Sequence, residues 1–119
     1  MREDPKEFVK SLQTAMEGFS KIDKETLKAF GNLNETALKD GALDRKTKTL
    51  MCLAIGIADH CEYCIAARTA QAIQAGAKRE ELIETASVGL LMGGSLAMGP
   101  IITVFVDTID RLAPASDNE

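Results

Sequence analysis

Apolar residues recur at three- and four-residue steps along most of this 119-residue chain, which is the period of an amphipathic helix. The first apolar stripe follows Asp4 and Pro5, a good N-cap and a good first helical residue. Its members are Phe8, Val9, Leu12, Ala15, Met16 and Phe19. The next stripe predicts a second helix from about residue 23 to residue 40, where Gly41 ends it.

The rest of the chain continues the helical pattern. Asp44 is placed to cap a third helix that ends near His60, and Gly76 is placed to end a fourth helix that begins near Cys61. Two further helices are expected over residues 79–92 and 100–112, and no segment of useful length has the period of a strand. The sequence therefore predicts an all-α bundle of about six helices, with residues 1–119 as a single domain and a disordered tail at 115–119.

Residues 85–106 carry no charge, and a run of that length can span a bilayer. A Gly-Gly-Ser segment and a following Gly-Pro step interrupt it, which favours a turn and a fresh helix start. We therefore expect two short buried helices and no membrane partner. Because both helices are apolar on nearly every side, and a six-helix monomer has little interior, the chain should form a closed homo-oligomer.

Charge and cysteine content narrow the function classes. Acidic residues outnumber basic ones by 18 to 14, and the basic residues are scattered, so no nucleic acid partner is expected. The N-terminus is charged without an apolar stretch behind it, which argues against a signal peptide. Three cysteines are too few for a secreted disulfide framework. We therefore expect a cytoplasmic protein.

The chemistry centres on Cys61 and Cys64. Two side chains three positions apart on a helix have Cβ atoms about 5–6 Å apart, close enough for a disulfide. A helix start also lowers the pKa of a thiol, and the thiolate can attack a peroxide or another disulfide. Two other interpretations stay open, namely inert packing and half of a zinc site completed by Cys52 or His60, although no second cysteine or histidine pair is present. No cofactor and no metal is expected.

Several segments together resemble the carboxymuconolactone decarboxylase family in its alkyl hydroperoxidase D-like branch. They are residues 43–48 (LDRKTK), 61–67 (CEYCIAA), 75–77 (AGA), 79–84 (REELIE) and 91–94 (LMGG). The resemblance implies an all-helical alkyl hydroperoxidase D-like fold and assembly into trimers or hexamers. It also implies a thiol-dependent peroxidase or disulfide reductase that acts on a peroxide or a protein disulfide and is recycled by a thiol reductant.

The resemblance fails at two positions. In the redox branch a histidine usually follows the second cysteine by four residues and a glutamate precedes the first by twelve, whereas this chain has Arg68 and Thr49 there. Neither can relay a proton. His60 either substitutes as a base or is a polar residue at a helix junction, and Arg68 either lowers a thiol pKa or points away. Two functions therefore stay open: a dithiol enzyme, or a catalytically degenerate scaffold of the same fold.

Overall fold

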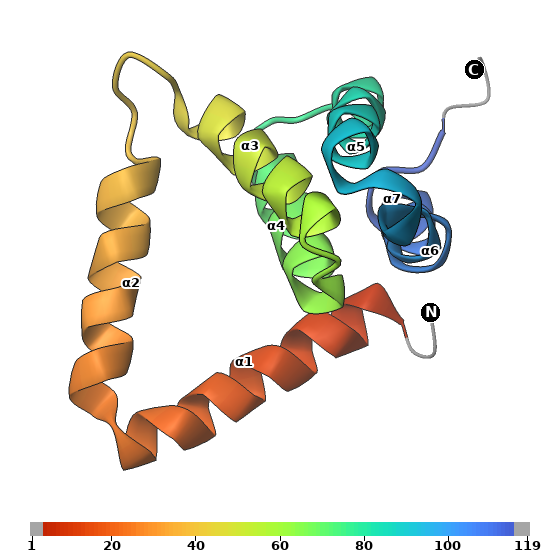
Figure 1. Cartoon of the computed structure of the whole chain (residues 1–119). Coiled ribbons are helices and arrows are strands. Elements are labelled where there is room, and N and C mark those ends of the chain that lie inside the picture. The colour runs from red at the N-terminus through yellow and green to blue at the C-terminus, as the bar shows by residue number, and fades with distance from the viewer. Residues whose placement is uncertain (1–3, 116–119) are drawn as a thin grey trace.

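Residues 4–115 are described by a computed structural model, in which helices and short connections account for the chain and no strand occurs (Figure 1). The elements are α1 Pro5–Ile22, α2 Lys24–Leu38, α3 Arg45–Ala58, α4 Glu62–Gln74, α5 Arg79–Gly93, the 3₁₀ turn η1 Gly94–Ala97, α6 Met98–Pro100, the π turn η2 Ile101–Phe105 and α7 Val106–Leu112. The predicted all-α fold is confirmed. The expected tail lies outside the described residues except for Ala115.

The predicted helix boundaries have the expected physical causes. Asp4 and Asp44 are the N-caps of α1 and α3, and their carboxylates accept from the amides of Lys6 and Thr47, each at 2.8 Å. Gly76 ends α4 in the left-handed region, with φ at 99°. Its amide and that of the next residue donate back to the last turn, which is the Schellman arrangement expected of a C′ glycine.

The core is built around α3, which packs between α4 and α5 (Figure 1). Fully buried side chains on these three helices include Leu53, Ile57, Ile65 and Leu82, and Val104 of η2 joins the same core. Gly89 on α5 allows the close approach, since a Cβ there would lie 2.8 Å from Cγ2 of Ile57. Leu53 and Ile57 thus lie on the core face of α3.

The first turn of α3 is basic, which is the unfavourable sign for the helix dipole. The structure compensates it with acids from neighbouring helices. Arg45 pairs with Glu35 of α2 at 3.3 Å, and Nζ of Lys46 donates to Glu81 of α5 at 2.9 Å. That hydrogen bond lowers the pKa of the Glu81 carboxyl and raises the pKa of Lys46. The basic turn therefore ties α3 to two other helices.

By length and composition, the 34 residues Arg79–Leu112 are apolar enough to cross a membrane, with mean hydropathy 1.8 in the most apolar window. The contacts show a hairpin, however. The Arg79 guanidinium donates to the carboxylate of Asp110 and to the carbonyl of Ala113 at 2.9 Å each. A straight helix would place residues 31 apart at about 46 Å. The chain turns back after Gly93, where the sequence predicted a break.

The expectation that both arms of this hairpin are buried is wrong for the single chain. Leu91 and Met92 are 79% and 76% exposed, and Met98 is exposed too. A second exposed apolar surface lies on α1 and α2, which extend away from the core as an open V (Figure 1). Leu38 is the one buried residue of α2. Self-association stays a prediction, and these two surfaces are the ones it would cover.

Candidate redox site

Cys61 and Cys64 form a disulfide at the N-terminus of α4, with their Cα atoms 5.2 Å apart. Cys61 is the N-cap residue, and its Sγ accepts a hydrogen bond from the amide of Cys64 at 3.3 Å. Both residues are half-buried. The pair therefore has the placement that the sequence predicted, at a helix start where unpaired amides favour negative charge on sulfur.

The turn before the pair explains His60. This residue has φ at 59°, and its amide donates to the carbonyl of Ile57, while the amide of Cys61 donates to the carbonyl of Gly56. These two bonds are a Schellman ending of α3, with His60 in the left-handed position. Its ring is exposed and, within residues 4–115, makes no hydrogen bond to either cysteine. The geometry supports the junction interpretation of His60.

Gly56 is a site residue that the sequence reasoning missed. A Cβ at this position would lie 3.0 Å from Cβ of Cys64, so only glycine lets the start of α4 pack this closely on α3. An isolated glycine within an apolar helical run was the available signal. Cys61 is therefore held at its amide by α3, and Cys64 is held against α3 through Gly56.

Thr49 and Arg68, at the two positions where the resemblance fails, are both occupied elsewhere. The buried Thr49 hydroxyl donates to the carbonyl of Arg45 at 2.7 Å. Nη1 of Arg68 donates to Oδ1 of Asn34 at 3.1 Å and to Oε1 of Gln71 at 2.9 Å. Asn34 and Gln71 were not predicted, because a contact between α2 and α4 has no signature in sequence spacing. Neither Thr49 nor Arg68 has a titratable group that could relay a proton at neutral pH.

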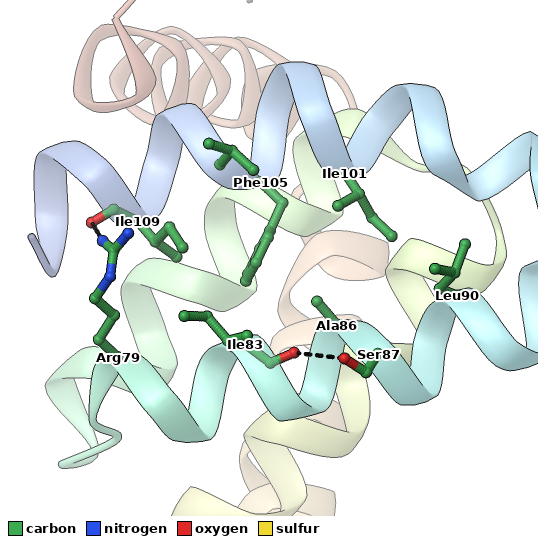
Figure 2. Close-up of a pocket in the computed structure, with 9 residues that line it drawn as sticks. Arg79, Ile83, Ala86, Ser87, Leu90, Ile101, Phe105 and Ile109 are labelled. Atoms are coloured by element: carbon green, nitrogen blue, oxygen red, sulfur yellow. Dashed lines mark hydrogen bonds between the residues drawn. The ribbon is translucent and has the colours of Figure 1, made fainter. Parts of the chain in front are cut away.

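Two cavities border these elements, and a larger one lies apart from them. Tyr63 lines an apolar pocket of about 250 Å³ with residues of α1 and α2: Leu12, Ala15, Met16, Phe19 and Leu27. Thr49 and Gln71 border a smaller cavity of about 140 Å³ with a mixed polar and apolar lining. The largest of the three, about 310 Å³, lies between the hairpin arms, and none of its lining residues comes from α4 (Figure 2). Figure 2 shows Phe105 and Ile101 facing α5 across it.

Cys52 on α3 is a free, half-buried cysteine. Residues 4–115 contain no group of three or more histidine, cysteine, aspartate or glutamate side chains placed to hold a metal ion. The zinc interpretation, with Cys52 or His60 as further ligands, therefore finds no support in the described part of the chain.

The chain thus combines an all-helical fold with a cysteine pair at the start of α4. Comparison with known protein families assigns it. The model of the carboxymuconolactone decarboxylase family matches residues 24–99, and the chain belongs to this family. Over 84 residues it is 32% identical to the uncharacterised protein 4 in the cox locus of Paracoccus denitrificans, covering 69% of this chain and 76% of that protein. An uncharacterised protein of Cupriavidus necator is 32% identical over 68 residues, or 57% of this chain, and the alignment spans 60% of that protein's length.

Solved structures agree with this assignment. A carboxymuconolactone decarboxylase family protein of Legionella pneumophila superposes with a TM-score of 0.78 at 32% identity, covering 87% of this chain and 96% of that one. A family member from Thermotoga maritima, for which a part in the antioxidative response has been suggested, gives 0.76 at 28% identity, covering 88% and 89%. The fold and the family are thus established.

Proposed function

We propose that this protein is a dithiol oxidoreductase of the alkyl hydroperoxidase D-like kind, which reduces disulfides readily and peroxides slowly through Cys61 and Cys64. One observation carries the proposal: the two cysteines are paired at the N-terminus of α4, with Sγ of Cys61 already accepting the amide of Cys64. The likeness to the Thermotoga maritima protein, for which an antioxidative role has been suggested, points the same way.

The reduced state supplies the nucleophile. The amide of Cys64 and the helix N-terminus favour the thiolate of Cys61. This thiolate attacks one sulfur of a substrate disulfide, forming a mixed disulfide and releasing one substrate thiolate. Cys64, as it loses its proton, then attacks Sγ of Cys61 and releases the second thiolate. The substrate gains two electrons and two protons, and the protein is left with the Cys61–Cys64 disulfide, which a thiol reductant must reopen.

Peroxide reduction needs one more group. Attack of the thiolate on a peroxide gives a sulfenic acid and expels an alkoxide or hydroxide, which must be protonated. Thr49 and Arg68 occupy the positions at which the family's proton relay would be expected, and neither can donate a proton at neutral pH. Disulfide leaving groups are thiolates, which need no such help. We therefore expect disulfide exchange to be the faster reaction.

The test compares the three cysteines. In Cys64→Ser, reaction with a protein disulfide should stop at a mixed disulfide on Cys61, visible by mass spectrometry, whereas Cys61→Ser should lose the reaction. Cys52→Ser is the matched control, since Cys52 is free and lies outside the pair. Mixed disulfide formation at Cys52, or equal loss of rate in all three variants, would overturn the proposal.

A second candidate is a scaffold of the same fold without turnover. Thr49 and Arg68 favour it, because the partners of their hydrogen bonds are residues other than the two cysteines. Absence of any exchange by the reduced pair would select this candidate. For the enzyme, we propose a homo-oligomer, trimer or hexamer, in a reducing compartment such as the cytoplasm, since the disulfide must be reopened in each cycle.

A further inference from the structure

Arg68 is the only basic residue of α4 and lies one turn after Cys64. Both hydrogens of its Nη1 are used, by Oδ1 of Asn34 and Oε1 of Gln71. These acceptors are neutral amides, so they position the guanidinium without neutralising it. The other arginines of residues 4–115, which are Arg45, Arg79 and Arg111, each pair with a carboxylate of this chain. Arg68 is the one arginine in that range without an ion pair.

The geometry leaves one edge of the guanidinium open. A guanidinium has five N–H donors in a planar fork, and a carboxylate is bound most strongly by two parallel bonds to one edge. With Nη1 occupied, Nε and Nη2 form the edge that the hydrogen bonds of residues 4–115 leave unused. A half-buried, fixed and uncompensated arginine is what anion recognition requires.

We propose that Arg68 is a carboxylate-binding residue of the dithiol site, so that the site prefers disulfides carrying a carboxylate a few bonds from sulfur. The proposal rests on the proposed function, because it names the substrate class of the same cysteine pair. Residues four apart lie on one helix face, with Cβ atoms about 5–6 Å apart. A carboxylate on Arg68 therefore places a nearby sulfur in front of Cys64 and Cys61.

Disulfide exchange with such a substrate follows the same steps as in the proposed function. The thiolate of Cys61 forms a bond to one substrate sulfur, and the substrate disulfide bond breaks. Cys64 then closes the protein disulfide and releases the second carboxylate-bearing thiol, so that one dithiol is oxidised and one disulfide is reduced. Arg68 contributes binding and orientation only. Arg68 should therefore change the ratio of the reduction rates of different substrates, rather than change all of these rates by the same factor.

Three disulfides of equal length measure that ratio. 3,3′-Dithiodipropionate is a dianion, bis(2-hydroxyethyl) disulfide is neutral and cystamine is a dication. We expect the reduced protein to consume the dianion at least about tenfold faster than the neutral compound, as for a hydrogen bond between charged groups, and cystamine slowest. Equal rates for all three, at matched ionic strength, would overturn the inference and leave the proposed function intact.

Variants separate recognition from structural support. Arg68→Gln should abolish the preference for the dianion. Asn34→Asp should do the same while leaving Arg68 in place, because it adds a carboxylate at the position of the present amide oxygen. Arg45→Gln, which removes an arginine already paired with Glu35, is the matched control and should keep the preference. If Arg68 only ties α2 to α4, Arg68→Gln will slow all three substrates equally.

Binding of a dicarboxylate to the oxidised protein distinguishes failure of the carboxylate site from failure of the proposed function. Suberate is the analogue of 3,3′-dithiodipropionate in which methylenes replace both sulfurs, and it cannot be reduced. It should shift the backbone NMR signals of α4 in the wild type and not in Arg68→Gln. Suberate binding without disulfide reduction would remove the proposed function and keep the carboxylate site. Disulfide reduction without suberate binding or charge preference would do the reverse.

Discussion

Cys61 links the end of α3 to the start of α4. Its amide closes the end of α3 by donating to Gly56, and its sulfur caps the start of α4. The turn also requires a left-handed residue immediately before it, which is His60. The cysteine is therefore positioned by backbone hydrogen bonds rather than by a partner side chain, and the site should tolerate changes to the His60 ring.

Replacing His60 by glycine tests this interpretation. Glycine adopts the left-handed region without the steric cost that other residues incur there, so His60→Gly should increase the free energy of unfolding by about 1 kcal/mol. The rate of disulfide exchange should stay within twofold of wild type. Chemical unfolding and stopped-flow kinetics measure the two quantities. A large loss of rate in a stable His60→Gly protein would show that the ring acts as a base.

Within residues 4–115, Thr69 is the buried side chain with an unsatisfied oxygen. Thr69 is fully buried, and its Oγ1 has no hydrogen-bond partner among residues 4–115. An unpaired buried hydroxyl is costly, so Thr69→Val should stabilise the fold by about 1 kcal/mol. Thr108 is the control: equally buried, it donates to the carbonyl of Val104 at 2.7 Å. Thr108→Val should be destabilising, and equal effects at both positions would contradict the assignment.

At the scale of elements, glycine packing determines how α5 approaches α3. A Cβ at Gly89 would lie 2.8 Å and 2.9 Å from two side-chain atoms of Ile57 and 3.0 Å from a backbone oxygen. Gly89→Ala should therefore destabilise the fold by about 1–3 kcal/mol, the usual cost of overpacking. Gly31 in α2 has nothing within 4 Å of such a Cβ. Gly31→Ala should instead stabilise by about 0.4–1 kcal/mol, and urea unfolding compares the two.

The Lys46–Glu81 pair between α3 and α5 should make stability depend on pH. The hydrogen bonds from Lys46 and from the amide of Lys78 lower the pKa of the Glu81 carboxyl in the folded state. Their contribution is therefore complete above the unfolded pKa of glutamate, near 4.5, and is lost as the pH falls through the lower folded value. The stability difference between wild type and Glu81→Gln should shrink on acidification, whereas a constant difference from pH 7 to pH 3 would exclude the linkage.

The sequence was informative about elements and much less so about their contacts. Capping residues such as Asp4 and Asp44 and the C′ glycine at Gly76 act locally, so their positions could be read directly. The cysteine pair could be placed at a helix start for the same reason. The contact of Asn34 with Arg68 joins residues 34 apart, and the role of Gly56 depends on a second helix. Nothing in periodicity or spacing specifies either contact.

At the scale of the whole molecule, two apolar surfaces have no cover within the described chain. One lies at the turn of the α5–α7 hairpin, where Leu91, Met92 and Leu96 are each more than two-thirds exposed. The other lies on α1 and α2, and on α2 the side chains of Phe30 and Leu33 are each 62% exposed. Apolar patches of this extent on a small protein are typical of an interface.

We therefore expect the protein to be a closed oligomer at micromolar concentration, with both surfaces buried between copies. Changing Leu91 and Met92 together to lysine places two charges on the hairpin turn, and Phe30→Lys with Leu33→Lys does the same on α2. Either pair should lower the mass measured by multi-angle light scattering, because an interface cannot bury unpaired lysines. Lys28→Ala on α2 is the control and should leave the assembly intact, since a single exposed polar change is near neutral. A wild-type monomer would contradict the prediction for both surfaces. An unchanged mass in one pair would assign the interface to the other surface.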